Sequence, residues 1–145
     1  GIFSLLKIFD EITIDVHLSV VGKTENQKQN NKKINYIGFG FDAPKLIKIY
    51  DNHNISILPS FTEAHPKVID ESLARFRPVI IFEEIKHVIQ NKKGIFVSKR
   101  NVKSLLETID FIMRNYVNIQ ESMNKNKLPT KQEFISQMNN ILNSN

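Results

Sequence analysis

Five short runs of β-branched and other apolar residues recur along the chain, and stretches with helical spacing separate most of them. The runs lack the alternation of apolar and polar residues that a half-exposed strand shows. Strands buried on both faces have this composition, and they occur in parallel sheets covered by helices. We therefore expect five buried parallel strands, at residues 16–21, 34–37, 55–58, 79–82 and 95–97.

The remaining segments carry apolar stripes at helical spacing. Asp42 is an expected N-cap with Pro44 in the first turn after it, and Thr130 with Glu133 forms a capping box before the last helix. Strands that alternate with helices predict right-handed βαβ units, and hence an α/β fold with a Rossmann-like doubly wound parallel sheet. The predicted helices lie at residues 2–9, 44–50, 66–74, 83–89, 102–116 and 130–142.

A doubly wound domain normally begins with a strand, whereas this chain begins with an amphipathic helix at residues 2–9. The sequence therefore predicts either that the sheet lacks its first strand or that the chain is a piece of something longer. A length of 145 residues is typical of one domain. We expect a single domain over residues 1–145, with residues 128–145 as a C-terminal helix. The polar residues 23–33 indicate either an exposed loop or a disordered segment.

Composition argues against several classes of function. No apolar run reaches the roughly 18–20 residues that span a bilayer, and residues 1–10 do not have the pattern of a secretory signal. The absence of cysteine removes disulfide scaffolds and thiolate metal sites, and His17, His53 and His87 do not have metal-ligand spacing. The net charge of +5 is mild, and basic and aromatic residues are not interleaved on one face, so we expect no nucleic-acid partner.

The segment at residues 55–80 has the richest chemistry. A buried strand ends at Leu58, a short loop follows, and a helix begins near Pro66. Ligands of open α/β sheets bind outside the carboxyl ends of the strands. Glu63 on the loop and Glu71 on the helix are acceptor-only carboxylates, and sugar hydroxyls are donors. The two acids are therefore candidates for binding two sets of sugar hydroxyls.

The same residues carry a resemblance. The pattern Pro-Ser-x-x-Glu-x-x-Pro-x-x-x-x-Glu-x-x-Ala at residues 59–74, followed by Pro-Val-Ile at 78–80, resembles the donor-binding signature of the group 1 glycosyl transferases, the retaining GT4 family with the GT-B fold. Further landmarks are similar in register, and the likeness covers nearly the whole chain. They lie at residues 16–22, 36–38, 46–50, 91–97 and 104–113.

The resemblance implies that the chain is the donor-binding, C-terminal half of a retaining glycosyltransferase. Glu71 would accept hydrogen bonds from the ribose, and Glu63 would contact the transferred sugar near the reacting face, as the catalytic residue. Ser60 and Phe61 would line the loop. The backbone N–H groups that would approach the sugar or the diphosphate belong to Ala64, His65 and Lys67.

The family also implies a setting for the chain. No cofactor and no metal are expected, because basic side chains and a helix N-terminus stabilise the departing diphosphate. The acceptor would bind an N-terminal domain absent from this chain, so the chain alone would be inactive. We expect a bacterial enzyme of surface polysaccharide or glycolipid synthesis, in the cytoplasm or at the inner face of the membrane, with a peripheral membrane contact as one option.

Some positions depart from the family pattern and keep alternatives open. Ala64 and Phe76 stand where the family usually has glycine, so the backbone at Ala64 would approach a ligand less freely and the turn at Phe76 would differ. Arg75 and Arg77 are either diphosphate ligands or, as we favour, solvated surface residues. The rival interpretations are half of a sugar-nucleotide epimerase and a non-catalytic Rossmann-like interaction module.

Overall fold

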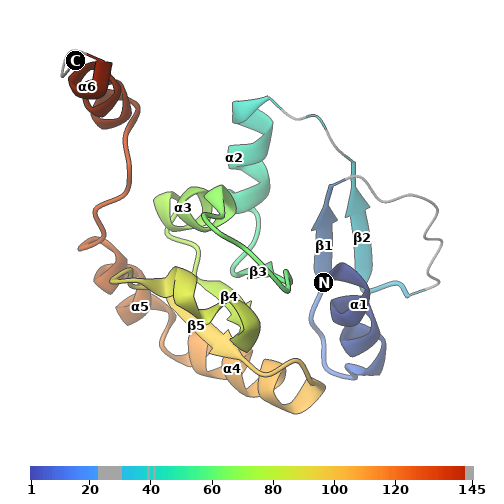
Figure 1. The fold of residues 1–145 in the computed structure, drawn as a ribbon. Helices are drawn as coiled ribbons and strands as arrows, with labels where there is room; N and C mark the ends of the chain where they lie inside the picture. Colours follow the sequence, from blue (N-terminus) through green and yellow to red (C-terminus); the bar gives the residue numbers. More distant parts are fainter. Residues whose placement is uncertain (23–30, 39, 41, 143–145) are drawn as a thin grey trace.

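The computed structural model describes residues 1–22, 31–38, 40 and 42–142. All five predicted strands are confirmed within this part of the chain, and helices separate most of them (Figure 1). The elements follow in the order α1 (Ile2–Glu11), β1 (Leu18–Val21), β2 (Ile34–Ile37), α2 (Ala43–Asp51), β3 (Ser56–Leu58), α3 (Lys67–Ala74), β4 (Val79–Phe82), η1 (Glu83–Ile89), β5 (Ile95–Ser98), α4 (Val102–Arg114), α5 (Tyr116–Met123) and α6 (Lys131–Leu142).

The strands form two parallel sheets rather than one continuous sheet. One sheet pairs β1 with β2, with Leu18 opposite Ile34. The other has the order β3–β4–β5, with Ser56 opposite Val79 and Val79 opposite Ile95. The two sheets stay separate because no described strand lies between β1 and β3.

Strand β4 is the centre of the core. Each of its four residues is 0% exposed, and the strand is paired along both edges. Its composition of Val, Ile, Ile and Phe has no polar position because helices cover both faces. Ile69 and Leu73 of α3 are buried in this core, and so are Leu105 and Ile112 of α4.

Helix α2 differs from the other helices of the body. Asp42 caps it as predicted, because its carboxylate accepts a hydrogen bond from the Lys45 N–H at 3.0 Å. The predicted apolar stripe is present, yet no residue of α2 is buried. The face that carries Leu46 and Ile49 borders the gap between β1 and β3, so no strand lies there to cover it.

Two predicted helices differ from the prediction, one in its extent and one in its type. The helix expected at residues 102–116 ends at Arg114, because Asn115 leaves the helical conformation and a second helix, α5, begins at Tyr116. The helix expected at residues 83–89 is the 3₁₀ segment η1, which is kinked at Ile85. Most of the predicted loop at residues 23–33 lies outside the described residues, which resume at Asn31.

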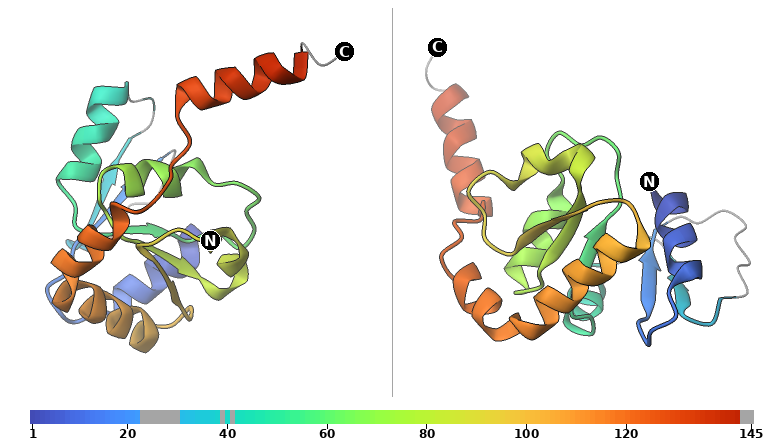
Figure 2. Two further views of the ribbon diagram at one scale, coloured as in Figure 1. Left: turned by 90° about the vertical axis from the view of Figure 1, so that its left-hand side faces the viewer. Right: turned by 90° about the horizontal axis from the view of Figure 1, so that it is seen from below.

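Helix α6 stands apart from the body of the molecule (Figure 2). The predicted capping box at its start is present. The Glu133 carboxylate accepts hydrogen bonds from the Thr130 N–H and hydroxyl, and the Thr130 hydroxyl accepts from the Glu133 N–H. No helix within the described ranges is long and apolar enough to cross a membrane.

The turn after α3 differs from the prediction made for Phe76. Phe76 takes a left-handed conformation, with φ of 53°, although it is not glycine. The N–H of Phe76 donates to the Leu73 carbonyl and that of Arg77 to the Ser72 carbonyl, each at 3.0 Å. This is the Schellman motif that glycine normally closes, so the turn keeps its usual shape and Phe76 is strained instead.

Replacing Phe76 with glycine should stabilise the protein. The change relieves a left-handed conformation that costs a residue with a β-carbon roughly 1–2 kcal/mol, at a side chain that is already 40% exposed. We expect the free energy of unfolding in urea to rise by about 1 kcal/mol in Phe76→Gly. The matched control Ala74→Gly, at the last residue of α3, should lower it by up to about 1 kcal/mol. A loss of stability in Phe76→Gly would contradict the assignment of strain.

Candidate functional site

The candidate site is built where β3, β4 and β5 end. Because parallel strands end at the same edge of their sheet, the segments that follow them lie side by side. These segments are residues 59–66 after β3, the start of η1 after β4, and Lys99 with Arg100 after β5.

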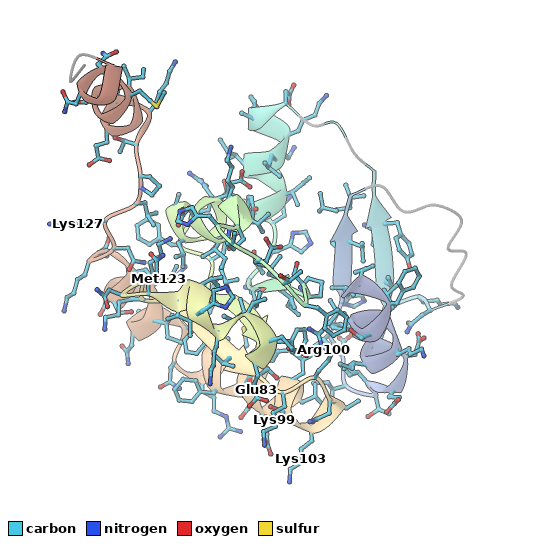
Figure 3. The ribbon with its side chains drawn as sticks, viewed as in Figure 1. Glu83, Lys99, Arg100, Lys103, Met123 and Lys127 are labelled. Atoms are coloured by element: carbon cyan, nitrogen blue, oxygen red, sulfur yellow. The ribbon has the colours of Figure 1, made fainter. Side chains whose placement is uncertain are left out.

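Arg100 joins these segments (Figure 3). Its guanidinium donates to the carbonyl oxygens of Pro59 at 3.0 Å and Ser60 at 3.2 Å, and to the Ser4 hydroxyl of α1 at 2.9 Å. It also donates to both carboxylate oxygens of Glu84, at 3.0 and 3.3 Å. This one side chain therefore fixes the loop after β3 relative to β4 and α1.

Two aromatic rings enclose the same guanidinium. The central carbon of Arg100 lies 4.0 Å from the ring centroid of Phe61 and 4.1 Å from that of Phe82. Rings attract a cation through their electron-rich faces, and the attraction grows where water is excluded. The Arg100 side chain is only 13% exposed, so Phe61 is held in place although this residue is 54% exposed.

Ser60 and Glu63 are brought together within the loop. The Ser60 hydroxyl donates to the Glu63 carboxylate at 2.7 Å, and the carbonyl oxygen of Glu63 lies 2.8 Å from Nε2 of His87 in η1. Glu63 is therefore held through both its side chain and its backbone. Its side chain is half-buried at the carboxyl end of β3, where the sequence predicted it.

The predicted backbone donors lie at the start of α3. Ala64, His65 and Lys67 are all exposed. Pro66 is the N-cap residue, and no described side chain caps this helix. Ala64 and His65 border a depression of only about 10 Å³, closed by the ion pair of Asp70 and Lys92 at 2.6 Å.

Glu71 lies on α3, apart from the loop of residues 59–66. It is in the middle of α3, and its carboxylate accepts a hydrogen bond from the Tyr50 hydroxyl at 3.1 Å. Burial, followed by the Glu71 charge and this hydrogen bond, raises the pKa of Tyr50 above its ordinary value. Both side chains border a cavity of about 660 Å³ between β1 and β3, which residues 60–67 do not line.

Arg75 and Arg77 have structural roles at the other edge of the sheet, before β4 begins. Arg75 makes a two-point ion pair with Asp51, with N–O distances of 2.9 and 2.7 Å. Arg77 donates to the carbonyl oxygens of Tyr50 and Asp51 and to the Tyr116 hydroxyl. The expectation that both are solvated surface residues is therefore wrong for Arg77, which is half-buried and clamps the end of α2.

Sequence reasoning missed Arg100, Tyr50 and His87. The position of Arg100 directly after a buried strand was a usable signal, because the carboxyl ends of parallel strands carry ligand sites. Nothing in the sequence connects Tyr50 to Glu71 or His87 to Glu63, since those contacts depend on tertiary packing. Within the described residues, no three His, Asp or Glu side chains are grouped so as to hold a metal ion.

Parallel strands with helices on both sides, and polar loops at the carboxyl ends of the strands, define a Rossmann-like α/β domain of the kind that forms half of a GT-B glycosyltransferase. The sequence model of the family "Glycosyl transferases group 1" matches residues 1–115. The chain belongs to the group 1 glycosyl transferase family. No curated protein gives a significant match.

Among solved structures, the crystal structure of HepE from Anabaena in complex with UDP is similar to this chain. The two share a TM-score of 0.64 and 15% sequence identity, over 85% of this chain and 39% of that one. The likeness establishes the shared fold. This chain spans about two fifths of the length of that neighbour.

Arg100→Lys should destabilise the protein and loosen the loop after β3. Lysine keeps the positive charge but lacks the planar fork that reaches both carbonyl oxygens and Glu84. We expect the free energy of unfolding to fall by about 2–3 kcal/mol and amide exchange at residues 60–63 to accelerate. The control Arg114→Lys alters an exposed pair on α4 and should change stability by less than about 0.5 kcal/mol. Equal effects of the two changes would contradict the role of Arg100.

The ion pair of Glu84 and Arg100 should make stability depend on pH. The Arg100 hydrogen bond, with a smaller backbone contribution, lowers the pKa of Glu84. A lowered pKa in the folded state stabilises the protein above the unfolded-state pKa of about 4.3, and this stabilisation is lost as the pH falls through the folded-state pKa. The free energy of unfolding, measured by chemical denaturation between about pH 5 and pH 3, should therefore fall less steeply in Glu84→Gln than in the unmodified protein. In the neighbouring control Glu83→Gln, the free energy of unfolding should change with pH as it does in the unmodified protein.

Proposed function

We propose that this chain is the donor-binding domain of a retaining glycosyltransferase, which moves a sugar from a nucleotide diphosphate sugar to an acceptor hydroxyl. The observation that carries the proposal is the family match over residues 1–115, which includes the whole segment from Ser60 to Glu71. The position of that segment at the carboxyl end of β3 supports the proposal, because open α/β sheets bind ligands there.

Each predicted residue has a proposed role. Glu63, held by Ser60 and His87, accepts hydrogen bonds from hydroxyls of the transferred sugar close to the reacting carbon. Glu71 accepts from the ribose. Its bond to Tyr50 uses one of the roughly four acceptor positions of a carboxylate, so further donors can bind.

The remaining loop residues bind the donor around these two acids. The Phe61 ring, fixed on Arg100, lines the loop with Ser60. The N–H groups of Ala64, His65 and Lys67 at the start of α3 approach the sugar or the diphosphate, where the positive end of the helix dipole favours an anion.

In the proposed reaction the acceptor oxygen forms a bond to the anomeric carbon as the bond from that carbon to the diphosphate breaks. The diphosphate leaves with the electron pair, and the acceptor proton passes to the released diphosphate. This domain orients the donor, and basic side chains outside the chain stabilise the diphosphate without a metal. The acceptor binds a second domain, so the chain alone has little or no transferase activity.

The biological setting is proposed at the level of the family. We infer a bacterial enzyme of the GT4 type that builds surface polysaccharide or glycolipid in the cytoplasm or at the inner face of the membrane. HepE is described in complex with UDP, which makes uridine diphosphate sugars the first donors to test.

A titration of the chain with uridine, guanosine and adenosine diphosphate sugars, followed by ligand-observed NMR, tests the proposal. We expect binding of one nucleotide class at about millimolar Kd, equivalent to roughly −4 kcal/mol, because the basic groups for the diphosphate lie outside the chain. Glu71→Gln should abolish the signal, since hydrogen bonds to a charged group contribute about 1.5–3 kcal/mol each. Glu107→Gln makes the same chemical change on an exposed side chain of α4 and should leave binding unchanged.

Loss of binding in both variants would point to a fold defect rather than a donor contact. A folded chain that binds none of the nucleotide sugars at millimolar concentration would favour the non-catalytic interaction module. That alternative has one supporting observation, because the depression beside Ala64 and His65 is too small for a sugar as it stands.

A further inference from the structure

The surroundings of the Glu71 carboxylate on α3 are set by the end of α2. Figure 1 shows the two helices side by side. The last two residues of α2 are Tyr50 and Asp51, and each contacts a side chain of the facing segment. Tyr50 binds Glu71 of α3, and Asp51 binds Arg75, the residue directly after α3. Two adjacent residues of α2 therefore hold two charged groups that lie four residues apart.

The spacing of Glu71 and Arg75 favours an ion pair between them. Residues four apart lie on one face of a helix, and a glutamate that precedes the basic residue is the favourable order. Arg75 makes its two-point ion pair with Asp51 instead. Among the residues that the structure describes, no cation lies within ion-pair distance of Glu71. Asp51 therefore takes up the cation that is placed to pair with Glu71.

This diversion of Arg75 matters for what Glu71 can bind. An ionised carboxylate has roughly four acceptor positions, and a guanidinium that pairs with it through two parallel bonds occupies two of them. A ligand hydroxyl would then compete with a charged donor for the remaining positions. The Arg75 hydrogen bond lowers the pKa of Asp51, so Asp51 stays ionised near neutral pH and retains Arg75.

Tyr50 gives Glu71 a neutral donor in place of the cation. Its hydroxyl donates to Oε2 of Glu71 at 3.1 Å, and burial with the Glu71 charge raises the pKa of Tyr50, so the hydroxyl keeps its proton. Arg77 fixes the backbone of this helix end, because it donates to the Tyr50 and Asp51 carbonyl oxygens at 3.1 Å each. One oxygen of Glu71 is therefore held, while Oε1 has no hydrogen-bond partner within the described residues.

We propose that Asp51 and Tyr50 are positioning residues for Glu71, with Asp51 withholding Arg75 from the carboxylate and Tyr50 orienting it for the ribose hydroxyls of the donor. The inference rests on the proposed function, in which Glu71 accepts hydrogen bonds from the ribose. Neither positioning residue contacts the donor. Both act through the Glu71 carboxylate, so their effect depends on the hydroxyls that Glu71 binds.

The role of Asp51 is tested by titration with UDP, followed by ligand-observed NMR. Asp51→Asn releases Arg75 to pair with Glu71, and we expect the Kd for UDP to rise by about two- to fivefold. Adding Arg75→Gln to the same chain should return the Kd to that of the unmodified protein. An unchanged Kd in Asp51→Asn, or a raised Kd that Arg75→Gln does not restore, would overturn this role.

A matched control makes the same chemical change at another ion pair. Asp110→Asn breaks the exposed pair of Asp110 and Arg114 on α4, away from Glu71, and should leave the Kd for UDP unchanged. An equal rise of the Kd in Asp110→Asn and Asp51→Asn would overturn the proposal, because it would reflect the net charge of the protein.

The role of Tyr50 is tested with two ligands that differ in the ribose. Tyr50→Phe removes the hydroxyl that holds Glu71 and should raise the Kd for UDP by about three- to tenfold. It should leave the Kd for 2′,3′-dideoxy-UDP unchanged, because this ligand lacks the hydroxyls that Glu71 accepts from. An equal loss of affinity for both ligands would overturn the role of Tyr50 and show a structural effect alone.

The unmodified chain separates failure of this inference from failure of the proposed function. If the unmodified chain binds neither UDP nor a nucleotide sugar, the proposed function fails and the inference fails with it. If Glu71→Gln abolishes UDP binding while the Asp51 and Tyr50 variants bind normally, the inference alone fails. Should Asp51→Asn not fold, Tyr50→Phe keeps the aromatic ring and still decides whether the end of α2 acts through Glu71.

Discussion

The complete burial of β4 determines the arrangement of the other elements. A strand that is 0% exposed along its length must be paired on both edges and covered on both faces, because its backbone polar groups have no access to water. Strands β3 and β5 satisfy the edges, and α3 and α4 contribute the buried apolar side chains that complete the core. Since all three strands are parallel, their carboxyl ends lie at one edge, and the loop that carries Glu63 lies there with Arg100.

The order at this edge comes from hydrogen bonds to one charged side chain, Arg100, which is only 13% exposed. A guanidinium removed from water needs partners for its N–H groups, and Arg100 finds them in two carbonyl oxygens, a hydroxyl and a carboxylate. Loop backbone that would otherwise be free to move is thereby bound to two other elements. Arg75 differs from Arg100, because it binds a single exposed carboxylate, that of Asp51, and fixes no loop. The low exposure of Arg100 and its bonds to loop carbonyl oxygens, rather than the ion pair alone, make it a determinant of the loop conformation.

Local sequence patterns predicted the positions of most helices and strands, but they did not predict the contacts between these elements. The β-branched runs located all five strands, and the capping residues Asp42 and Thr130 marked helix starts correctly, because these signals act over a few residues. The turn at Phe76 was mispredicted because the Schellman hydrogen bonds outweigh the strain of a left-handed residue. The contact of Tyr50 with Glu71 and the role of Arg77 depend on how α2 meets α3 and β4, and no local pattern records that. The placement of Glu63 at the end of β3 followed from the fold rule alone, while the roles proposed for Glu63 and Glu71 stay predictions.

The two candidate acids both follow β3, yet they lie in different surroundings. Glu63 is on the loop at the carboxyl end of β3, the edge at which open α/β sheets bind their ligands, and Gly1 lies against Pro59 and Ser60 of the same loop. Glu71 is on α3 and borders, with Tyr50, the cavity of about 660 Å³ between β1 and β3, which residues 60–67 do not line. A donor that contacts both acids, as proposed, therefore extends from the end of β3 to the middle of α3.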